Sequence, residues 1–143
     1  MAIYSNGKLV DSSLIFSAAQ ILDNATTGLD STNTVYFGGG KSNKLQVNVA
    51  VASATFSIAQ NESLTIAIQY GTTSSPTTSL RDVIYTYKNT AGAEATAQGT
   101  LLCQYTIPGD KVANYDYAKL VYTTSADEGD ANDALDAWIS IVP

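Results

Sequence analysis

Strict alternation of apolar and polar residues is the feature that most limits how this chain can fold. In "KLQVNVAVA", residues 44–52, every second residue of the strand interior is apolar: Leu45, Val47, Val49 and Val51. The same period of two recurs in "SLTIAIQY" at 63–70 and in "GTLLCQYTI" at 99–107. Side chains alternate between the two faces of a β-strand, so this pattern predicts strands with one buried face.

Turn-forming residues separate the periodic segments. Segments rich in glycine, serine, asparagine or proline lie at 38–43, 71–79, 89–93, 108–110 and 125–133. Shorter β-rich stretches are found at 34–38, 54–59, 82–87, 117–124 and 135–142. About eight short strands separated by turns predict an all-β, jelly-roll-like Greek-key β-sandwich. The 143 residues are enough for a single domain, 1–143, with its own core.

The segment "DSSLIFSAAQILDN", residues 11–24, fits two structures. Ser12 or Ser13 could cap a short helix. Three apolar residues would share one face of that helix: Leu14, Ala18 and Ile21. The alternation of Leu14 and Phe16 fits an edge strand equally well. The apolar side chains of this region also predict a possible N-terminal arm, residues 1–23, that reaches a neighbouring molecule.

The charge pattern argues against several partners. Seven Lys and Arg stand against 13 Asp and Glu, which gives a net charge of −6. The basic residues are scattered, whereas nucleic-acid binding needs them clustered, so no nucleic-acid partner is expected. No apolar run approaches the ~18 residues of a membrane-spanning helix, and the start of the chain lacks the pattern of a secretory leader. We therefore expect a soluble protein made in a cytoplasm.

No catalytic residue and no cofactor are predicted. The chain has no histidine, so a Ser–His or Cys–His nucleophile pair cannot be formed. Cys103 lies within an alternating apolar set and is expected to be a buried structural residue. The acidic segment 127–136 offers oxygen ligands for Ca²⁺, but "DANDAL" matches the calcium-loop pattern only at its first positions. A glycosidase would need two carboxylates facing each other across a groove.

The aromatic residues between positions 115 and 138 allow more than one interpretation. In "YDYAKLVYTTS", Tyr122 is expected in the core with Ala118 and Leu120, while Tyr117 lies on the opposite, less buried face. Tyr115 is expected on the same face as Tyr117. Trp138 falls opposite the apolar row of the last strand, so either that strand is buried on both faces or the indole marks a contact surface. Core packing, a protein interface and carbohydrate stacking all use such residues.

The order and spacing of these elements resemble the Bordetella-phage-type capsid cement protein family. The segments that carry the resemblance are "SLIFSAAQIL", "TNTVYFG", "LQVNVAVASATF", "SLTIAIQYGTTSS", "IPGDKVANYDYAKLVYTT" and "LDAWISIV". Within them, the most specific parts are Phe16-Ser17-x-x-Gln20 and Tyr117-Ala118-Lys119-Leu120. The loop at 125–133 and the segment 89–98 are longer than the family pattern.

The resemblance implies a non-enzymatic decoration protein on the outer surface of a tailed-phage head. Such a protein would bridge neighbouring major capsid proteins, be part of the virion and form a dimer or trimer. The residues considered for these contacts are Phe16, Gln20, Tyr117 and Trp138. The alternative is a carbohydrate-binding β-sandwich module of a phage fibre or surface protein, and affinity for a glycan would discriminate the two.

Overall fold

The computed structural model describes residues 2–5, 8–38, 44–76, 81–92, 95–126 and 133–142. The strands are β1 (Ala2–Ser5), β2 (Lys8–Asp11), β3 (Ile15–Ile21), β4 (Leu29–Asp30), β5 (Val35–Tyr36), β6 (Lys44–Val51), β7 (Thr55–Phe56), β8 (Ser63–Gly71), β9 (Arg81–Lys88), β10 (Thr96–Ala97), β11 (Leu101–Thr106), β12 (Tyr117–Thr124) and β13 (Ala134–Val142). Two 3₁₀ turns, Ser12–Leu14 and Ala25–Thr27, and the short helix α1 (Gly109–Asn114) complete the described elements.

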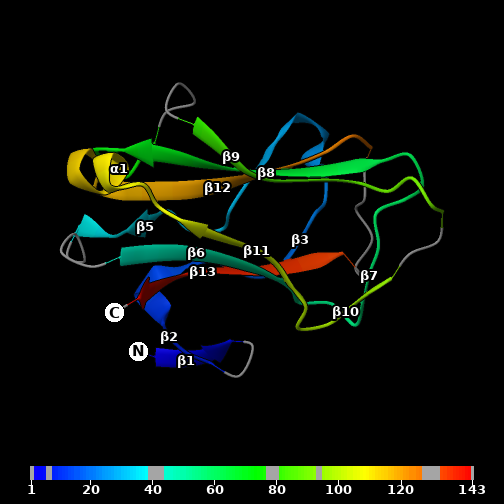
Figure 1. Cartoon of the computed structure of the whole chain (residues 1–143), viewed down its shortest axis with the longest axis horizontal. Helices are drawn as coiled ribbons and strands as arrows, with labels where there is room; N and C mark the ends of the chain where they lie inside the picture. The colour runs from blue at the N-terminus through cyan, green and yellow to red at the C-terminus, as the bar shows by residue number, and fades with distance from the viewer. Residues whose placement is uncertain are drawn as a thin grey trace.

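Two antiparallel sheets face each other and form a sandwich (Figure 1). One sheet has the strand order β11-β6-β13-β3. In the other, β12 pairs with β8, β8 pairs with β9, and the short strands β4 and β5 both pair with β12. Along the chain, the strands are distributed between the two sheets in the order of an eight-stranded jelly roll. The predicted fold class is therefore confirmed.

The core lies between the inner faces of the two sheets. The alternating apolar residues of β6 and β8 are buried there, as their period predicted: Leu45, Val47, Val49, Val51, Leu64, Ile66 and Ile68. From β12, Tyr122 is fully buried with Ala118 and Leu120, which confirms the predicted inner face of that strand. The core is thus built from the segments with the clearest period of two.

The N-terminal segment is a strand where a helix was one of the two predictions. Residues Ile15–Ile21 form β3, which pairs with β13 at the edge of the sheet, so the short-helix interpretation is wrong. The edge-strand alternative is confirmed for these residues. A strand is favoured here because it buries Phe16 between the sheets, while Ile15 faces the opposite side of the same sheet beside Trp138.

A bulge in β11 changes which leucine points inward. The predicted alternation placed Leu101 on the buried face with Cys103, but Leu101 is exposed and Leu102 is half-buried. The register against β6 shifts between Leu101 and Cys103. A bulge places two residues opposite one, so the side-chain alternation is interrupted at that point.

The first two strands form a separate two-stranded ribbon. β1 and β2 pair with each other in antiparallel register, from Ala2 opposite Asp11 to Ser5 opposite Lys8. The ribbon lies outside the sandwich, beside the sheet that contains β13 (Figure 1), and its contact with that sheet runs from β2 to β13. We call β1 and β2 the N-terminal ribbon.

Candidate interaction sites

Phe16 is part of the core and is not available as a surface contact. Its side chain has 0% exposure and packs in the main cluster between the sheets. Its prediction as an interface residue is therefore corrected. The reason is an irregularity in β3: its register against β13 shifts between Ser17, opposite Ala137, and Ile15, opposite Trp138. The shift interrupts the alternation of side chains, so the Phe16 ring lies between the sheets.

The Gln20 side chain joins the two sheets at one edge of the sandwich through hydrogen bonds within the chain. β3 bulges before it, and Ala19 has a φ of 48°, a conformation that costs energy for a residue with a side chain. The Ala19 N–H donates to the Asp136 carboxylate at 2.7 Å, which stabilises this bulge. The Gln20 side chain then donates to the Asp30 carbonyl at 2.8 Å and accepts from the Thr32 N–H at 2.9 Å. Its polar atoms are used within the chain, and a contact with a partner stays a prediction.

Trp138 is buried on the outer face of its sheet. It is 2% exposed and forms a small second cluster with Ile15 and Ala50, apart from the main core. Its prediction as a contact surface is therefore wrong, and the alternative of a last strand buried on both faces is confirmed, because Leu135, Ala137 and Ile139 are buried on the inner side. The ribbon strand β2 contacts β13 on this molecule.

Tyr117 lies at the start of β12 on the less buried face, as predicted. Its ring packs against Tyr36 with centroids 5.1 Å apart and planes inclined by 56°. Tyr36 is 54% exposed, and a Cβ on Gly38 would come within 2.7 Å of its ring. The absence of a side chain at Gly38 therefore leaves room for the Tyr36 ring. The pair is an exposed aromatic surface, but its tilted rings do not form one flat platform.

Tyr115 does not share a face with Tyr117. It follows α1, and its ring stacks on the buried Tyr70 with centroids 5.8 Å apart. The Lys111 ammonium lies over both rings, 5.6 Å and 5.9 Å from their centroids. The predicted common face is wrong because β12 begins only at Tyr117, after a bend at Asp116 that ends the regular alternation.

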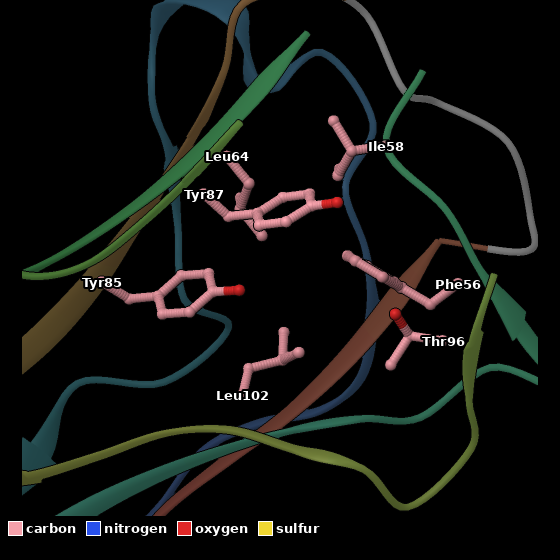
Figure 2. A pocket seen from close by; sticks show the side chains of 7 residues that line it. All are labelled: Phe56, Ile58, Leu64, Tyr85, Tyr87, Thr96 and Leu102. Atoms are coloured by element: carbon pink, nitrogen blue, oxygen red, sulfur yellow. The ribbon is translucent and has the colours of Figure 1, made fainter. Parts of the chain in front are cut away.

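A cavity opens between β9 and β11, on the side of the sandwich opposite Gln20. It has a volume of about 150 Å³. Its lining comes from both sheets of the sandwich, from the short strand pair β7 and β10, and from the connection between β7 and β8 (Figure 2). The lining residues are Phe56, Ile58, Leu64, Tyr85, Tyr87, Thr96 and Leu102. The strands β9 and β11 are edge strands of different sheets and do not pair with each other. The two sheets are thus joined by the Gln20 hydrogen bonds at one edge of the sandwich, and a cavity separates them at the other edge, between β9 and β11.

The acidic segment gives no metal centre within the described residues. Positions 127–132 of the calcium candidate lie outside them. Asp133 is buried and accepts the Ser57 N–H at 3.0 Å, while Asp136 accepts the Ala19 N–H. In the part of the chain that is described, no three His, Cys, Asp or Glu side chains gather closely enough to hold a metal ion. No helix in that part is long and apolar enough to cross a membrane.

We expect Cys103→Ser to lower the free energy of unfolding by only about 0.5–1.5 kcal/mol. Cys103 is buried, as predicted, and its thiol donates to the Ile84 carbonyl at 3.4 Å, so a serine hydroxyl would retain an acceptor. The cost is the packing of sulfur against the core. Urea denaturation of both proteins measures it.

Burial also raises the pKa of the Cys103 thiol, so a thiol reagent should modify the folded protein much more slowly than the urea-unfolded chain. Equal rates in the two states would contradict the burial.

We expect alkaline pH to destabilise the fold through Tyr122. Burial raises the pKa of this phenol well above its ordinary value of 10.0, and a hydrogen bond with Ser17 partly opposes the rise. Below pH 10 both states keep the proton. Above pH 10 the unfolded chain releases it while the folded protein retains it, so unfolding is favoured by about 1.4 kcal/mol per pH unit until the folded pKa is reached.

Tyr122→Phe tests this pH dependence. The variant should show a shallower loss of unfolding free energy between pH 10 and pH 11.5, in urea titrations at each pH. The slopes are compared rather than the absolute values, because the lost hydrogen bond to Ser17 lowers stability at every pH. Identical slopes in the two proteins would contradict the assignment to Tyr122.

Comparison with known proteins gives a likeness of fold. The sequence matches no protein family and no curated protein. Among solved structures, it is similar to the crystal structure of the infectious bursal disease virus VP2 subviral particle, with a TM-score of 0.41 and 14% sequence identity. The likeness covers 90% of this chain, and the chain spans 30% of the length of that one. No function is inferred from a likeness at this level.

Sequence reasoning missed two of these sites. Tyr36 lies in the predicted β-rich stretch 34–38, where nothing but the nearby Gly38, which leaves room for its ring, distinguishes it from the other tyrosines. Tyr85 and Tyr87 alternate in "DVIYTYK", which indicates a shared face. The cavity that these two tyrosines line depends on the distance between the edge strands β9 and β11, which a local sequence pattern does not predict.

Proposed function

We propose that this protein is a non-enzymatic capsid cement protein that binds the outer surface of an assembled tailed-phage head and bridges neighbouring major capsid proteins. The resemblance of its element order to that family supports the proposal. The observation that carries it is the N-terminal ribbon. Within the described residues, β1 pairs with β2 alone, so one edge of β1 carries backbone groups that no strand of this chain pairs.

An open edge of this kind fits a protein that adheres to others. A two-stranded ribbon alone is marginally stable in water, and it gains stability when another surface covers it. Natural proteins usually protect an exposed edge with charges or proline, but β1, "AIYS", contains neither. Strand addition to a neighbouring sheet would pair these backbone groups and give affinity without a deep pocket.

Cementing needs only modest affinity at each site. A ligand that binds the assembled lattice and not the free subunits stabilises the lattice by about 2.7 kcal/mol per site at a hundredfold excess over Kd. The net charge of −6 supports a position on the outside of a shell, because packaged DNA repels a negatively charged protein. The proposal includes a dimer or trimer, which would increase the number of anchors and hence the effective concentration.

The test uses shells that lack the protein. Purified wild type should co-sediment with them and raise their heat resistance. A variant that lacks residues 2–5 should remain folded, because the strand it loses belongs to no sheet of the sandwich, and should bind about tenfold more weakly or worse. The control is Val83→Ser, which changes an exposed side chain on β9 and should bind as wild type does.

The outcomes separate the function from the role of the ribbon. Wild-type protein that neither binds shells nor stabilises them sinks the cement proposal. Unchanged binding by the truncated variant leaves the function in place and removes the ribbon from it. A longer truncation through residue 23 is uninformative, because it deletes Phe16 and Leu22, both fully buried. Sedimentation velocity of the wild type and the variant measures the oligomer.

The carbohydrate-binding alternative rests on Tyr36. Trp138 and Tyr115, two of the residues that motivated it, are buried or stacked inside the chain. Tyr36 remains an exposed aromatic ring supported by Tyr117, which is the kind of surface that stacks on a sugar. Binding to a glycan array that Tyr36→Ala abolishes would favour this function over cementing.

A further inference from the structure

The cavity between β9 and β11 has the size of one small ring. Its volume is about 150 Å³, and an apolar cavity of this volume in a protein accommodates a molecule such as benzene. Its deep side is apolar and buried, with Phe56, Ile58 and Leu64. Tyr85 and Leu102 are half-buried and lie toward solvent. A small molecule can therefore enter from the side of these two residues.

Hydroxyl groups give the cavity a polar side. The Tyr85 hydroxyl points into the space enclosed by the other side chains, and the Thr96 hydroxyl lies beside the Phe56 ring (Figure 2). The Tyr87 hydroxyl points toward Ile58 (Figure 2). The Tyr85 phenol is protonated at neutral pH, as its ordinary pKa of 10.0 requires, and burial raises that pKa further, so the hydroxyl can both donate and accept a hydrogen bond.

The walls of the cavity are fixed by hydrogen bonds. The Asn89 side chain donates to the Ile58 carbonyl at 2.7 Å, and the Ser57 N–H donates to the Asp133 carboxylate at 3.0 Å. Two-residue pairing of β7 with β10 places Thr96 opposite Phe56. The connection from β7 to β8 is thus held from both sides. Because these walls are already ordered, a ligand can bind in the cavity without the entropic cost of ordering them.

We infer that this cavity is a binding site for a single phenol-type ring, with the ring against Phe56 and Leu64 and its hydroxyl hydrogen-bonded to Tyr85. A purely apolar ring would fill the space but make no hydrogen bond with the Tyr85 hydroxyl. A hexose would place its own hydroxyls against Phe56, Ile58 and Leu64, where they would be unpaired. The inference does not depend on the proposed cement function, since the site lies on the sandwich and not on the N-terminal ribbon.

Titration of the ¹⁵N-labelled full chain with p-cresol tests the site. We expect saturable shifts of backbone amides at the lining residues of β9, β11 and the connection after β7. Toluene, which has the same ring without the hydroxyl, should bind about five- to tenfold more weakly, the effect of one hydrogen bond. Glucose should cause no shift at these residues.

Matched variants locate the binding. Leu102→Trp fills the cavity from its mouth and should abolish the shifts, whereas Leu101→Trp, at the exposed neighbouring position, should retain them. Should Leu102→Trp fail to fold, Tyr85→Phe keeps the cavity shape and should lower p-cresol affinity to that of toluene.

Several outcomes would overturn the site. These are the absence of saturable p-cresol shifts, equal p-cresol binding by folded Leu102→Trp, equal affinity for p-cresol and toluene, and competition by glucose. Binding of p-cresol with the expected variant pattern supports it.

Discussion

Phe16→Ala should lower the free energy of unfolding by about 3–5 kcal/mol, a large part of the 5–15 kcal/mol that holds a typical domain together. The Phe16 ring has 0% exposure and lies in the main core between the sheets. Removal of the ring takes away its burial and leaves a cavity that the paired strands β3 and β13 cannot readily close. Urea denaturation followed by far-UV circular dichroism measures the change.

Ile21→Ala is the matched control for this prediction. Ile21 lies on the same strand but is 41% exposed, so its truncation should cost less than about 1 kcal/mol. Equal stabilities of Phe16→Ala and wild type would show that the ring is not in the core. The result also limits how a shell-binding assay is interpreted, because Phe16→Ala would lose binding by unfolding and not by loss of a contact.

Asn89→Ala should lower the free energy of unfolding by about 2–4 kcal/mol, since it removes three hydrogen bonds and leaves the buried Ile58 carbonyl without its side-chain partner. Asn89 is 1% exposed. Its side chain donates to the carbonyls of Ile58 and Gly92 at 2.7 and 2.6 Å and accepts from the Ala91 N–H at 3.0 Å. The bond to Ile58 connects the end of β9 to the connection before β8, and the other two hold the segment that follows β9. Thermal and urea unfolding should both report the loss.

The control for this variant is Asn114→Ala. Asn114 also donates to a backbone carbonyl, that of Asp110 at 2.7 Å, but the bond is exposed and water can replace it. Its removal should change stability by no more than about 0.5 kcal/mol. A cost for Asn89→Ala as small as that of the control would contradict the role of Asn89 in holding the cavity wall.

The sequence predicted the parts of the fold that a local period of two determines. The strands β6, β8, β12 and β13 lie within a residue or so of their predicted ranges, because each has an apolar face that the sandwich must bury. The bulge at Leu102 was not predictable, since it depends on how β11 aligns with β6. Residues 108–110 were interpreted as a turn, but α1 begins at Gly109, and a helix of six residues is too short to show a period.

The predicted surface positions of the contact residues were wrong or incomplete for a related reason. A strand with apolar residues on both faces has two explanations, a surface contact or burial on both sides, and the sequence of β13 does not choose between them. Burial of Trp138 is decided by what lies over the outer face of its sheet. The hydrogen bonds of Gln20 were not predictable, because its partners Asp30 and Thr32 lie ten or more residues away in the sequence, at the facing edge of the other sheet.

Trp138 also gives the protein a built-in optical probe. It is the single tryptophan of the chain, so the intrinsic fluorescence above 300 nm on excitation at ~295 nm comes from one position. The indole is buried on the outer face of the sheet, on the strand that β2 of the N-terminal ribbon contacts. An indole in contact with water emits at longer wavelength than a buried one. Any rearrangement that brings water to this face of the sheet would therefore be seen as a red shift, without a label.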